Sequence, residues 1–258
     1  MTASTTVETM ARNIATILGE PFEWCFIKGG VVSLIDASDH GGTKGGVYRV
    51  SDFAIGKYLV TNSQFTKFLD HPNGFYDPKW WKFSPEGILW RRDHRNPKPT
   101  AFPGRNLPVT RVSWFDSVAF CNWLSSETDG IIRLPAEQEW QYAASGAMEW
   151  SYPWGNELDE TRGNYANIFG QTSPVGKYPA GQSPFGAMDM FGNVWEWCST
   201  IWGTESNDLG GYVYRTIRGG AWNVSNPEHL RAVDRGEGHS PRGQLNDCGL
   251  RIVLEFAN

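Results

Sequence analysis

The sequence predicts an α+β fold with short antiparallel strands, few helices and much irregular loop. Brief β-prone runs separated by glycine-rich turns fill residues 22–60, and this punctuation is typical of antiparallel pairing. Amphipathic helical segments are set among such runs, without the alternating β-α-β order of a doubly wound sheet. The 29 glycines and 15 prolines among 258 residues indicate that turns and irregular loops make up much of the chain.

An amphipathic helix is predicted at the N-terminus. Apolar side chains recur at three- and four-residue spacing over residues 6–18, and Gly19 with Pro21 ends the pattern. No charge run, Gly/Ser tract or compositional break follows it, so the rest of the chain is expected to form one domain. The predicted organisation is a helix over 1–22, packed on the main domain or on a partner, and a domain over 23–258.

Strands and helices then follow in the main domain. The β-prone runs are residues 25–27, 31–35, 47–50 and 53–55. Thr61 and Gln64 form a capping-box pattern that opens a first helix, and Ser113 with Asp116 opens a second. A third helix is predicted from about Pro135 to Ala144, because proline is well tolerated at a first helical position.

Two aromatic stretches are predicted to be rich in loops. Residues 186–222 combine tryptophans, methionines and glycines, and we expect them to form the centre of a loop-rich core, with a short β-prone run over residues 212–217 that ends at Gly219-Gly220. Glycines beside large side chains favour close backbone approach over a continuous regular element. Residues 71–110, rich in proline and tryptophan, are predicted to form a long, self-packed loop.

The charge pattern disfavours nucleic-acid binding. The formal net charge is −5, and no dense Lys/Arg stripe is present. One local basic cluster contains Arg91, Arg92, His94, Arg95 and Lys98. We interpret it as a solvated loop and not a phosphate clamp, because Asp93 interrupts it and no aromatic platform follows.

Cysteine usage and the N-terminus indicate a soluble, cytoplasmic protein. The four cysteines are widely spaced and form no C-x-x-C pair, which argues against a disulfide framework. The N-terminus lacks a basic region followed by an apolar core, so no signal peptide is expected. No apolar run approaches the length of a membrane span.

Common catalytic motifs are absent from the sequence, and one oxygen-rich group stands out. There is no H-E-x-x-H, G-x-S-x-G or G-x-G-x-x-G, and the five histidines show no ligand spacing. Asp189 and Glu196, with the backbone carbonyls of Gly192 and Val194 between them, could wrap a hard cation. Alternatively, Glu196 could pair with an arginine such as Arg218 or Arg251 beneath the core, and from the residues alone both interpretations stay open.

Several phrases occur in a fixed order along the chain. They are IGKYLVTNSQF (55–65), LPVTRVSW (107–114), RLPAEQEWQYAA (133–144), YPWGN (152–156), GNVWEW (192–197), RGGAW (218–222) and GLRIV (249–253). Each is weak alone, but the ordered set is specific. Over about residues 23–258 the chain resembles the formylglycine-generating enzyme (sulfatase-modifying factor) family. The resemblance implies a C-type-lectin-like fold of mixed α+β structure with little regular secondary structure.

The resemblance implies an oxidase, and two positions contradict that activity. Enzymes of the family oxidise a substrate cysteine to formylglycine with molecular oxygen, using copper(I) held by two cysteine thiolates, ligands that suit this soft ion. The two cysteines lie two and seven residues after the phrase that ends here at Trp222, where this chain has Val224 and His229. Cys248, at the far end of the C-terminal loop, stands alone. We therefore expect no copper. The ergothioneine-type sulfoxide synthases are also similar, but their H-x-x-x-H-x-E iron signature is missing here.

The resemblance also implies structural calcium. Family members bind it with an Asn or Asp, two backbone carbonyls and a Glu, which match Asp189, Gly192, Val194 and Glu196. A second family site would match Asn167-Ile168, but the loop that completes it is shortened here. A possible calcium ion is therefore expected at the first site alone.

A non-catalytic branch with this fold contains the variable proteins of diversity-generating retroelements. Their variable segment begins after R-G-G-[SA]-W and ends at G-[FL]-R, which corresponds to residues 223–248. Framework residues of the family pattern are kept at Arg231, Ala232, Arg235, Pro241, Gly249 and Arg251. The residues between them are a polar, small-residue assortment that suits ligand contact. They are Val224, Ser225, His229, Asp234, Gly236, Gly238, His239, Ser240, Gly243, Leu245, Asn246, Asp247 and Cys248.

Three hypotheses follow for the function. The first is a non-catalytic binder that presents residues 223–248 to an unknown protein or surface ligand on a calcium-stabilised scaffold. The second is a formylglycine-generating-type oxidase or another metal-dependent oxygenase of the same family. The third is a structural domain within a larger assembly.

Overall fold

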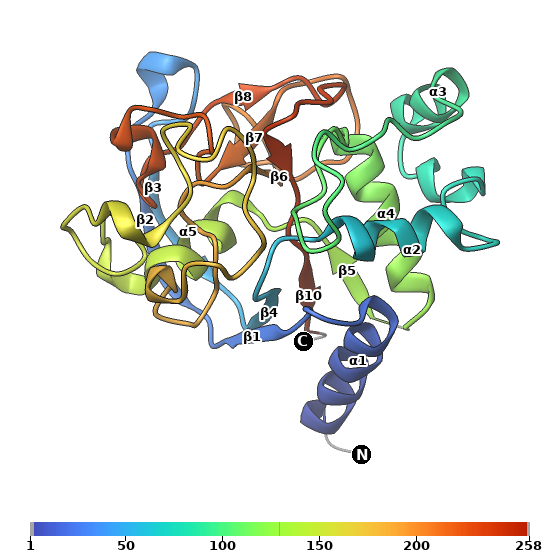
Figure 1. The fold of residues 1–258 in the computed structure, drawn as a ribbon, viewed down its shortest axis with the longest axis horizontal. Helices are drawn as coiled ribbons and strands as arrows, with labels where there is room; N and C mark the ends of the chain where they lie inside the picture. Colours follow the sequence, from blue (N-terminus) through green and yellow to red (C-terminus); the bar gives the residue numbers. More distant parts are fainter. Residues whose placement is uncertain (1–2, 129, 257–258) are drawn as a thin grey trace.

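Two four-stranded sheets form the centre of the molecule. The computed structural model describes residues 3–128 and 130–256; positions 1–2 and 257–258 of the two predicted segments lie outside the described residues. The first sheet contains β1 (Trp24–Ile27), β4 (Phe53–Gly56), β10 (Val253–Glu255) and β5 (Ile131–Arg133), in that order. Because β10 pairs antiparallel with both β4 and β5, the last strand joins distant parts of the chain (Figure 1).

The second sheet carries the C-terminal segment. It contains β8 (Gly238–His239), β7 (Arg215–Arg218), β6 (Trp195–Ile201) and β9 (Cys248–Gly249), in that order. β7 is antiparallel to β6 and to β8, whereas β9 runs parallel to β6. A separate hairpin pairs β2 (Gly30–Leu34) with β3 (Gly46–Val50). The antiparallel pairing predicted for residues 22–60 is confirmed by this hairpin and by the β1–β4 pair.

The prediction of an irregular core over residues 186–222 is wrong in part. Residues 195–201 form β6, a strand that lies between two partners and is buried over most of its length. Alternation is absent from such a strand because both of its faces are covered. The irregular description holds for the preceding residues, where Gly192 and Asn193 have positive φ angles of 72° and 69°.

The helices are α1 (Ala3–Leu18), α2 (Asn62–Asp70), α3 (Pro85–Asp93), α4 (Trp114–Ser126) and α5 (Glu137–Ser145). Of these, α2 and α4 follow the predicted capping signals, whereas α5 begins two residues after Pro135, with Ala136 as its N-cap. Short 3-10 turns are η1 (Ser38–His40), η2 (Pro78–Trp81), η3 (Gly146–Met148), η4 (Glu160–Arg162), η5 (Pro179–Gly181) and η6 (Pro227–Leu230). Both capping boxes form, Thr61 with Gln64 and Ser113 with Asp116.

The long loop predicted over residues 71–110 contains a helix. Ser84 caps α3 by accepting a hydrogen bond from the Gly87 N–H, and Pro85 occupies the first helical position. This start signal was present in the sequence. The prediction of self-packing is confirmed, because Trp80, Trp81 and Trp90 are all buried.

The N-terminal helix packs on the main domain near both chain ends. Ala11, Ile14 and Leu18 of α1 are buried, and the Trp24 indole N–H donates to the Ala11 carbonyl at 3.1 Å. Figure 1 shows α1 projecting on the side where the two termini lie, with β8 at the opposite end. Within the described residues, no helix has the length and apolar character to cross a membrane.

Buried ion pairs tie the two sheets and α5 together. Glu137 accepts from Arg218 at 3.0 Å and from Arg235 at 2.7 Å. Arg251, just before β10, pairs with Glu196 of β6 at 2.9 Å. All five side chains are nearly inaccessible to solvent. A buried charge is costly unless it is paired. These ion pairs therefore hold α5, β6 and β7 in fixed positions at the start of the C-terminal segment.

Candidate C-terminal binding face

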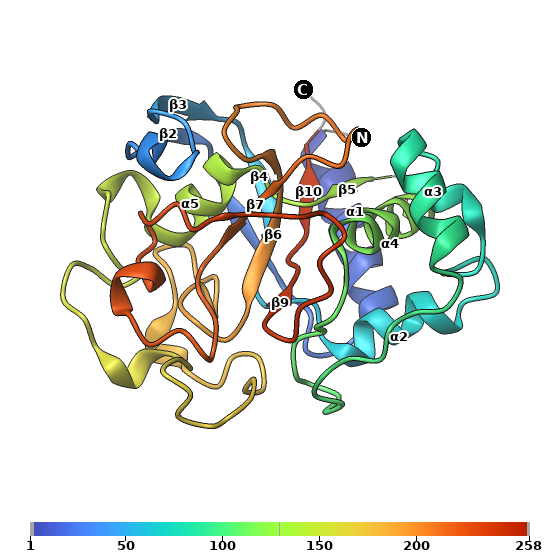
Figure 2. The ribbon, with the colours of Figure 1, turned by 90° about the horizontal axis from the view of Figure 1, so that it is seen from above.

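The turn after β7 sets the start of the C-terminal segment. β7 ends at Arg218, which Glu137 holds in the core. The chain then turns through Gly220, whose φ is +73°. A Cβ at Gly220 would lie 2.2 Å from Leu230 Cδ2, so only glycine permits this close approach. Ala221 and Trp222 follow Gly220. Seen from above, the segment after Trp222 crosses the face turned to the viewer (Figure 2).

The two positions that correspond to copper ligands hold no sulfur and face different surroundings. Val224 is half-buried and packs against the cluster that contains Tyr152, Tyr165 and Leu230. The His229 side chain is 57% exposed, and its Nδ1 lies 3.8 Å from Asp234 Oδ2. An aliphatic side chain in a packed cluster and a solvated imidazole cannot replace two thiolates that share one copper(I) ion.

The cysteines offer no substitute pair at this face. All four are free and buried, and burial raises the pKa of every one of them. Cys248 lies in β9 opposite Trp195 of β6. The reactive, metal-binding form of cysteine is the thiolate, and the surroundings of these thiols disfavour it.

The predicted face divides into displayed and half-buried positions. Ser225, His229 and Asn246 are exposed. Half-buried positions are Val224, Asp234, Gly236, Gly238, His239, Ser240, Gly243, Leu245 and Asp247. The two ends of the segment meet, because Asn223 Nδ2 donates to Asp247 Oδ2 at 2.9 Å. The structure thus brings the start and the end of the segment together.

Three residues of the segment serve the scaffold instead. A Cβ on Gly236 would lie 2.4 Å from the Ile217 carbonyl oxygen, and one on Gly238 would lie 2.3 Å from the Trp202 ring. Neither position has room for a side chain. Cys248 is completely buried. These residues cannot vary freely without disturbing the second sheet.

A strained turn beside the segment adds exposed apolar side chains. The Ala166 and Asn167 N–H groups donate to the Val224 and Trp222 carbonyls at 2.9 and 2.7 Å, and both residues have positive φ angles of 52° and 60°. The next two residues, Ile168 and Phe169, are 60% and 48% exposed. From the sequence, Asn167-Ile168 was considered only as a second calcium site. The signal that Ile168 and Phe169 contribute to the surface was the presence of two adjacent apolar residues in a turn.

Around the predicted calcium site, Glu196 is committed to protein partners. Its Oε1 and Oε2 each accept from Arg251 at 2.9 Å, and Oε2 also accepts from the Trp140 indole at 2.9 Å. Gly192 has a positive φ, and Val194 is completely buried. Of the two interpretations that the sequence left open, the structure therefore shows the pairing of Glu196 with an arginine, Arg251. A cation bound by all four predicted residues would have to take an oxygen of Glu196 from Arg251, so calcium stays a prediction.

Of the two carboxylates at the predicted calcium site, Asp189 is the one that forms no ion pair with the described residues. It is 8% exposed, and its Oδ2 accepts from the Gly176 N–H at 2.7 Å. Desolvation raises the pKa of this carboxyl to about 6, against the opposing effects of the Gly176 hydrogen bond and of Arg251. These surroundings disfavour the ionised carboxylate relative to water, and a cation beside it would stabilise it.

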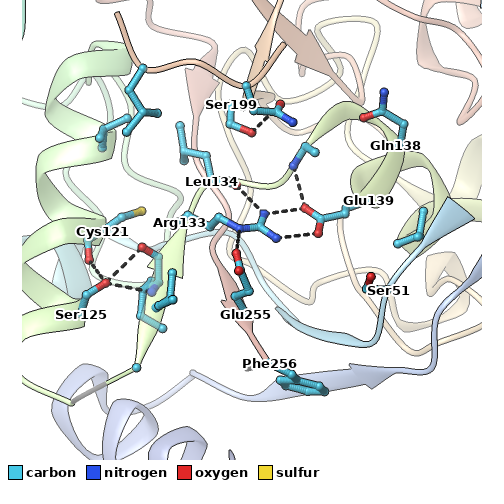
Figure 3. Close-up of a pocket in the computed structure, with 18 of the residues that line it drawn as sticks. Ser51, Cys121, Ser125, Arg133, Leu134, Gln138, Glu139, Ser199, Glu255 and Phe256 are labelled. Carbon is cyan, nitrogen blue, oxygen red and sulfur yellow. Dashed lines mark hydrogen bonds and ion pairs between the residues drawn. The ribbon is translucent and has the colours of Figure 1, made fainter. Parts of the chain in front are cut away.

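A separate cleft of about 860 Å³ lies between α4, α5 and the β5–β10 end of the first sheet. Figure 3 shows Arg133 at its centre, between Glu139 and Glu255. Arg133 donates to both Glu139 oxygens at 2.6 and 2.7 Å and to Glu255 at 2.6 Å. Burial opposes the charge on Arg133, but these partners outweigh it and raise its pKa. None of the predicted site residues lines this cleft, and the charge of Arg133 at its centre is compensated by the two carboxylates.

The fold belongs to the C-type-lectin-like class, as the comparison with solved structures shows. Treponema denticola variable protein 1 superimposes with a TM-score of 0.67 over 90% of this chain and 95% of that one, at 20% identity. At this identity the likeness concerns the fold alone.

Sequence comparison gives the family. The sulfatase-modifying factor enzyme 1-like domain matches residues 19–256, and the chain belongs to this family. Hercynine oxygenase of Mycobacterium tuberculosis is 34% identical over 246 residues, covering 81% of this chain and 54% of that protein. Inactive C-alpha-formylglycine-generating enzyme 2 of Mus musculus is 28% identical, covering 79% and 75%. This chain thus spans about half the length of the hercynine oxygenase.

Proposed function

We propose that this protein is a non-catalytic binder that presents a diversified surface, within residues 223–248, to a protein or surface ligand. The observation that carries the proposal is the nature of the positions two and seven residues after Trp222. Val224 is packed into an aromatic cluster, and His229 points to solvent beside Asp234. The family's two-thiolate copper chemistry has no ligands there.

The surface itself supports a role in ligand contact. Ser225, His229 and Asn246 are exposed, and the neighbouring turn adds the exposed side chains Ile168 and Phe169. A rigid scaffold that carries adaptable polar positions beside fixed apolar ones is the usual arrangement of a binding face. The fold shared with a variable protein and the relationship to a family member named inactive are consistent with this role.

Sequencing the DNA that flanks the coding region tests diversification directly. We expect a reverse transcriptase gene and a near-copy of the segment that encodes residues 223–251, differing from it only at adenines. We also expect that codons of displayed positions, such as Ser225 and Asn246, differ from the copy more often than those of Gly236 and Gly238. A locus with neither the gene nor the near-copy would remove the diversified surface from the proposal.

The non-catalytic part is tested with copper(I), a cysteine-containing peptide and an oxygen electrode. Because neither family copper ligand is present, we expect no stoichiometric copper binding and no oxygen uptake above the peptide-and-copper background. Stoichiometric binding accompanied by turnover would establish the oxidase instead.

A second candidate is a metal-dependent oxygenase, favoured by the 34% identity to hercynine oxygenase. Among the described residues, no group of three or more His, Cys, Asp and Glu side chains is arranged to hold a metal ion. We therefore expect no oxygen uptake when the purified chain is supplied with iron(II) and hercynine. Oxygen uptake that requires the chain, iron(II) and hercynine together would favour the oxygenase over the non-catalytic binder.

A further inference from the structure

A cationic cleft of about 530 Å³ lies between η2 and α3, at the edge of the molecule where Figures 1 and 2 both show α3. No residue of the segment 223–248 lines it. Four of its lining side chains are cationic: Lys82, Arg91, Arg92 and Arg95. None of the side chains that line it is a carboxylate. In a chain with a formal net charge of −5, such a local accumulation of positive charge requires a physical explanation.

Arg91 is held in place by aromatic rings. Its guanidinium carbon lies 4.9 Å from the ring centroid of Phe75, 5.1 Å from that of Trp81 and 5.8 Å from that of Tyr76. One terminal nitrogen donates to the His94 carbonyl at 3.0 Å. Cation–π contacts with several rings and the hydrogen bond to His94 hold the guanidinium group in place. The orientation of Arg91 is therefore set before any ligand arrives.

The charge of Arg91 is incompletely compensated. Its Nε is buried and has no hydrogen-bond partner among the described residues. Burial lowers the pKa of Arg91, Asp116 opposes this effect, and Arg95 adds to it. Asp116 is already engaged by the Trp90 indole at 2.9 Å and by the Ser113 hydroxyl at 2.7 Å. A desolvated cation with an unused donor is stabilised by an anion.

The other cations are available to the same anion. Arg92 is paired with Asp93 at 2.8 Å on an exposed surface. Neither Lys82 nor Arg95 has an ion-pair partner in the part of the chain that the structure describes, and both are exposed. Four cations less the carboxylates of Asp93 and Asp116 leave a local excess of two positive charges. An excess of this size favours a dianionic or more highly charged group over a single carboxylate.

We propose that this cleft binds a phosphate-bearing small molecule, with the phosphoryl groups on Arg91, Arg95 and Lys82 and the rest of the ligand against Tyr76 and Ile88. Guanidinium groups match phosphate oxygens geometrically. Tyr76 and Ile88 are 56% and 50% exposed and supply an apolar wall. The cleft volume lies within the range of small-molecule sites. The sequence interpretation as a loop is wrong for Arg91 and Arg92, which lie in α3. The aromatic residues near them precede the basic cluster in the sequence instead of following it.

Isothermal titration of the whole chain with ADP, adenosine and inorganic phosphate tests the proposal. We expect saturable ADP binding, weaker binding of phosphate and none of adenosine. Binding of phosphate as tight as that of ADP would assign the site to free phosphate, keeping the phosphoryl chemistry and removing the apolar wall. No saturable binding of ADP or phosphate, or equal binding of ADP and adenosine, would overturn the proposal.

Matched variants locate the binding. Lys82→Gln and Arg95→Gln change exposed residues and should each lower the ADP affinity about tenfold, the loss expected for one charge-assisted contact. Arg91→Lys retains the charge but loses the planar fork, and it should weaken ADP at least as much. Arg105→Gln removes an exposed cation outside the cleft and should leave the affinity unchanged. Equal effects of the Arg105 and Arg95 variants would show nonspecific attraction and contradict the site.

Discussion

Two kinds of residue alternate within the same C-terminal segment, and the structure separates them. Arg235 lies in the core, where it donates to Glu137 and to Thr43. Gly238 lies against Trp202, with no space for a side chain. Ser225 and Asn246, by contrast, are exposed. Residues 223–248 thus alternate between buried positions that contact the scaffold, which we call anchors, and positions exposed at the surface. Variation at its positions should therefore have effects that differ by several kcal/mol.

The largest effect is expected at the anchor beneath the segment. Glu137→Gln leaves Arg218 and Arg235 buried with no carboxylate between them. Removing one partner of a buried ion pair costs about 3–5 kcal/mol. Urea unfolding followed by tryptophan fluorescence should show a loss of stability of this size.

The matched control is Glu228→Gln, which removes the same charge from an exposed pair. Glu228 lies 2.6 Å from Arg231, and its side chain is 57% exposed. Exposed pairs contribute about 0–1 kcal/mol, so this variant should unfold close to the wild type. If the Glu137 and Glu228 variants lose equal stability, Arg218 and Arg235 are not held as the structure shows.

A second effect, of up to about 3 kcal/mol, is expected within the segment itself. Gly238→Ala introduces a methyl group where the Trp202 ring lies 2.3 Å away, and overpacking of this kind costs about 1–3 kcal/mol. Thermal unfolding should show a lower Tm, with the β7–β8 edge of the second sheet perturbed in hydrogen exchange. An unchanged Tm would mean that this part of the segment is free to vary, and the division between anchors and displayed positions would fail there.

Asp189 gives a third, pH-dependent effect. Its pKa in the folded protein is about 6, raised by burial from an ordinary 3.8. A raised carboxyl pKa stabilises the folded protein fully below pH 3.8, and this stability is lost as the pH rises through 6. The loss for a shift of this size is about 3 kcal/mol. The free energy of unfolding of the wild type, minus that of Asp189→Asn, should therefore fall by about this amount between pH 3.5 and pH 7.

The same pair of proteins tests calcium. A cation at Asp189 would favour the ionised carboxylate and offset its desolvation. Excess calcium at pH 7 should then raise the Tm of the wild type and leave that of Asp189→Asn unchanged. If calcium has the same effect on both, the predicted calcium site is contradicted, whereas the pH dependence stands on its own.

The sequence predicted the architecture more reliably than the site because the two depend on different ranges of interaction. Capping boxes and β-prone runs act over a few residues, so α2, α4 and the β2–β3 hairpin were predictable. β6 was not, since a strand covered on both faces has no alternation. The commitment of Glu196 to Arg251 joins residues 55 positions apart, and sequence could offer it only as one of two alternatives.

The same limit applies to displayed and anchored positions. Gly236 and Gly238 looked as variable as Ser225, because nothing local reveals that Ile217 and Trp202 occupy the space beside them. The aromatic rings around Arg91 could not be predicted either, since Phe75 and Trp81 contact it only once residues 75–81 are folded against α3. Only tertiary contacts distinguish these residues from solvated ones.

The smallest effect is expected where the side chains are displayed. Ser225→Ala, His229→Ala and Asn246→Ala alter exposed groups, and surface substitutions of this kind usually stay within about 0.5 kcal/mol. Because the three side chains are exposed, and the contact of His229 with Asp234 lies at the surface, the triple variant should lose no more than about 1.5 kcal/mol, the sum of independent small effects. Differential scanning calorimetry of the singles and the triple checks this. A triple variant that unfolds as readily as Glu137→Gln would show that these side chains belong to the scaffold, and a binding face built on them could not be diversified.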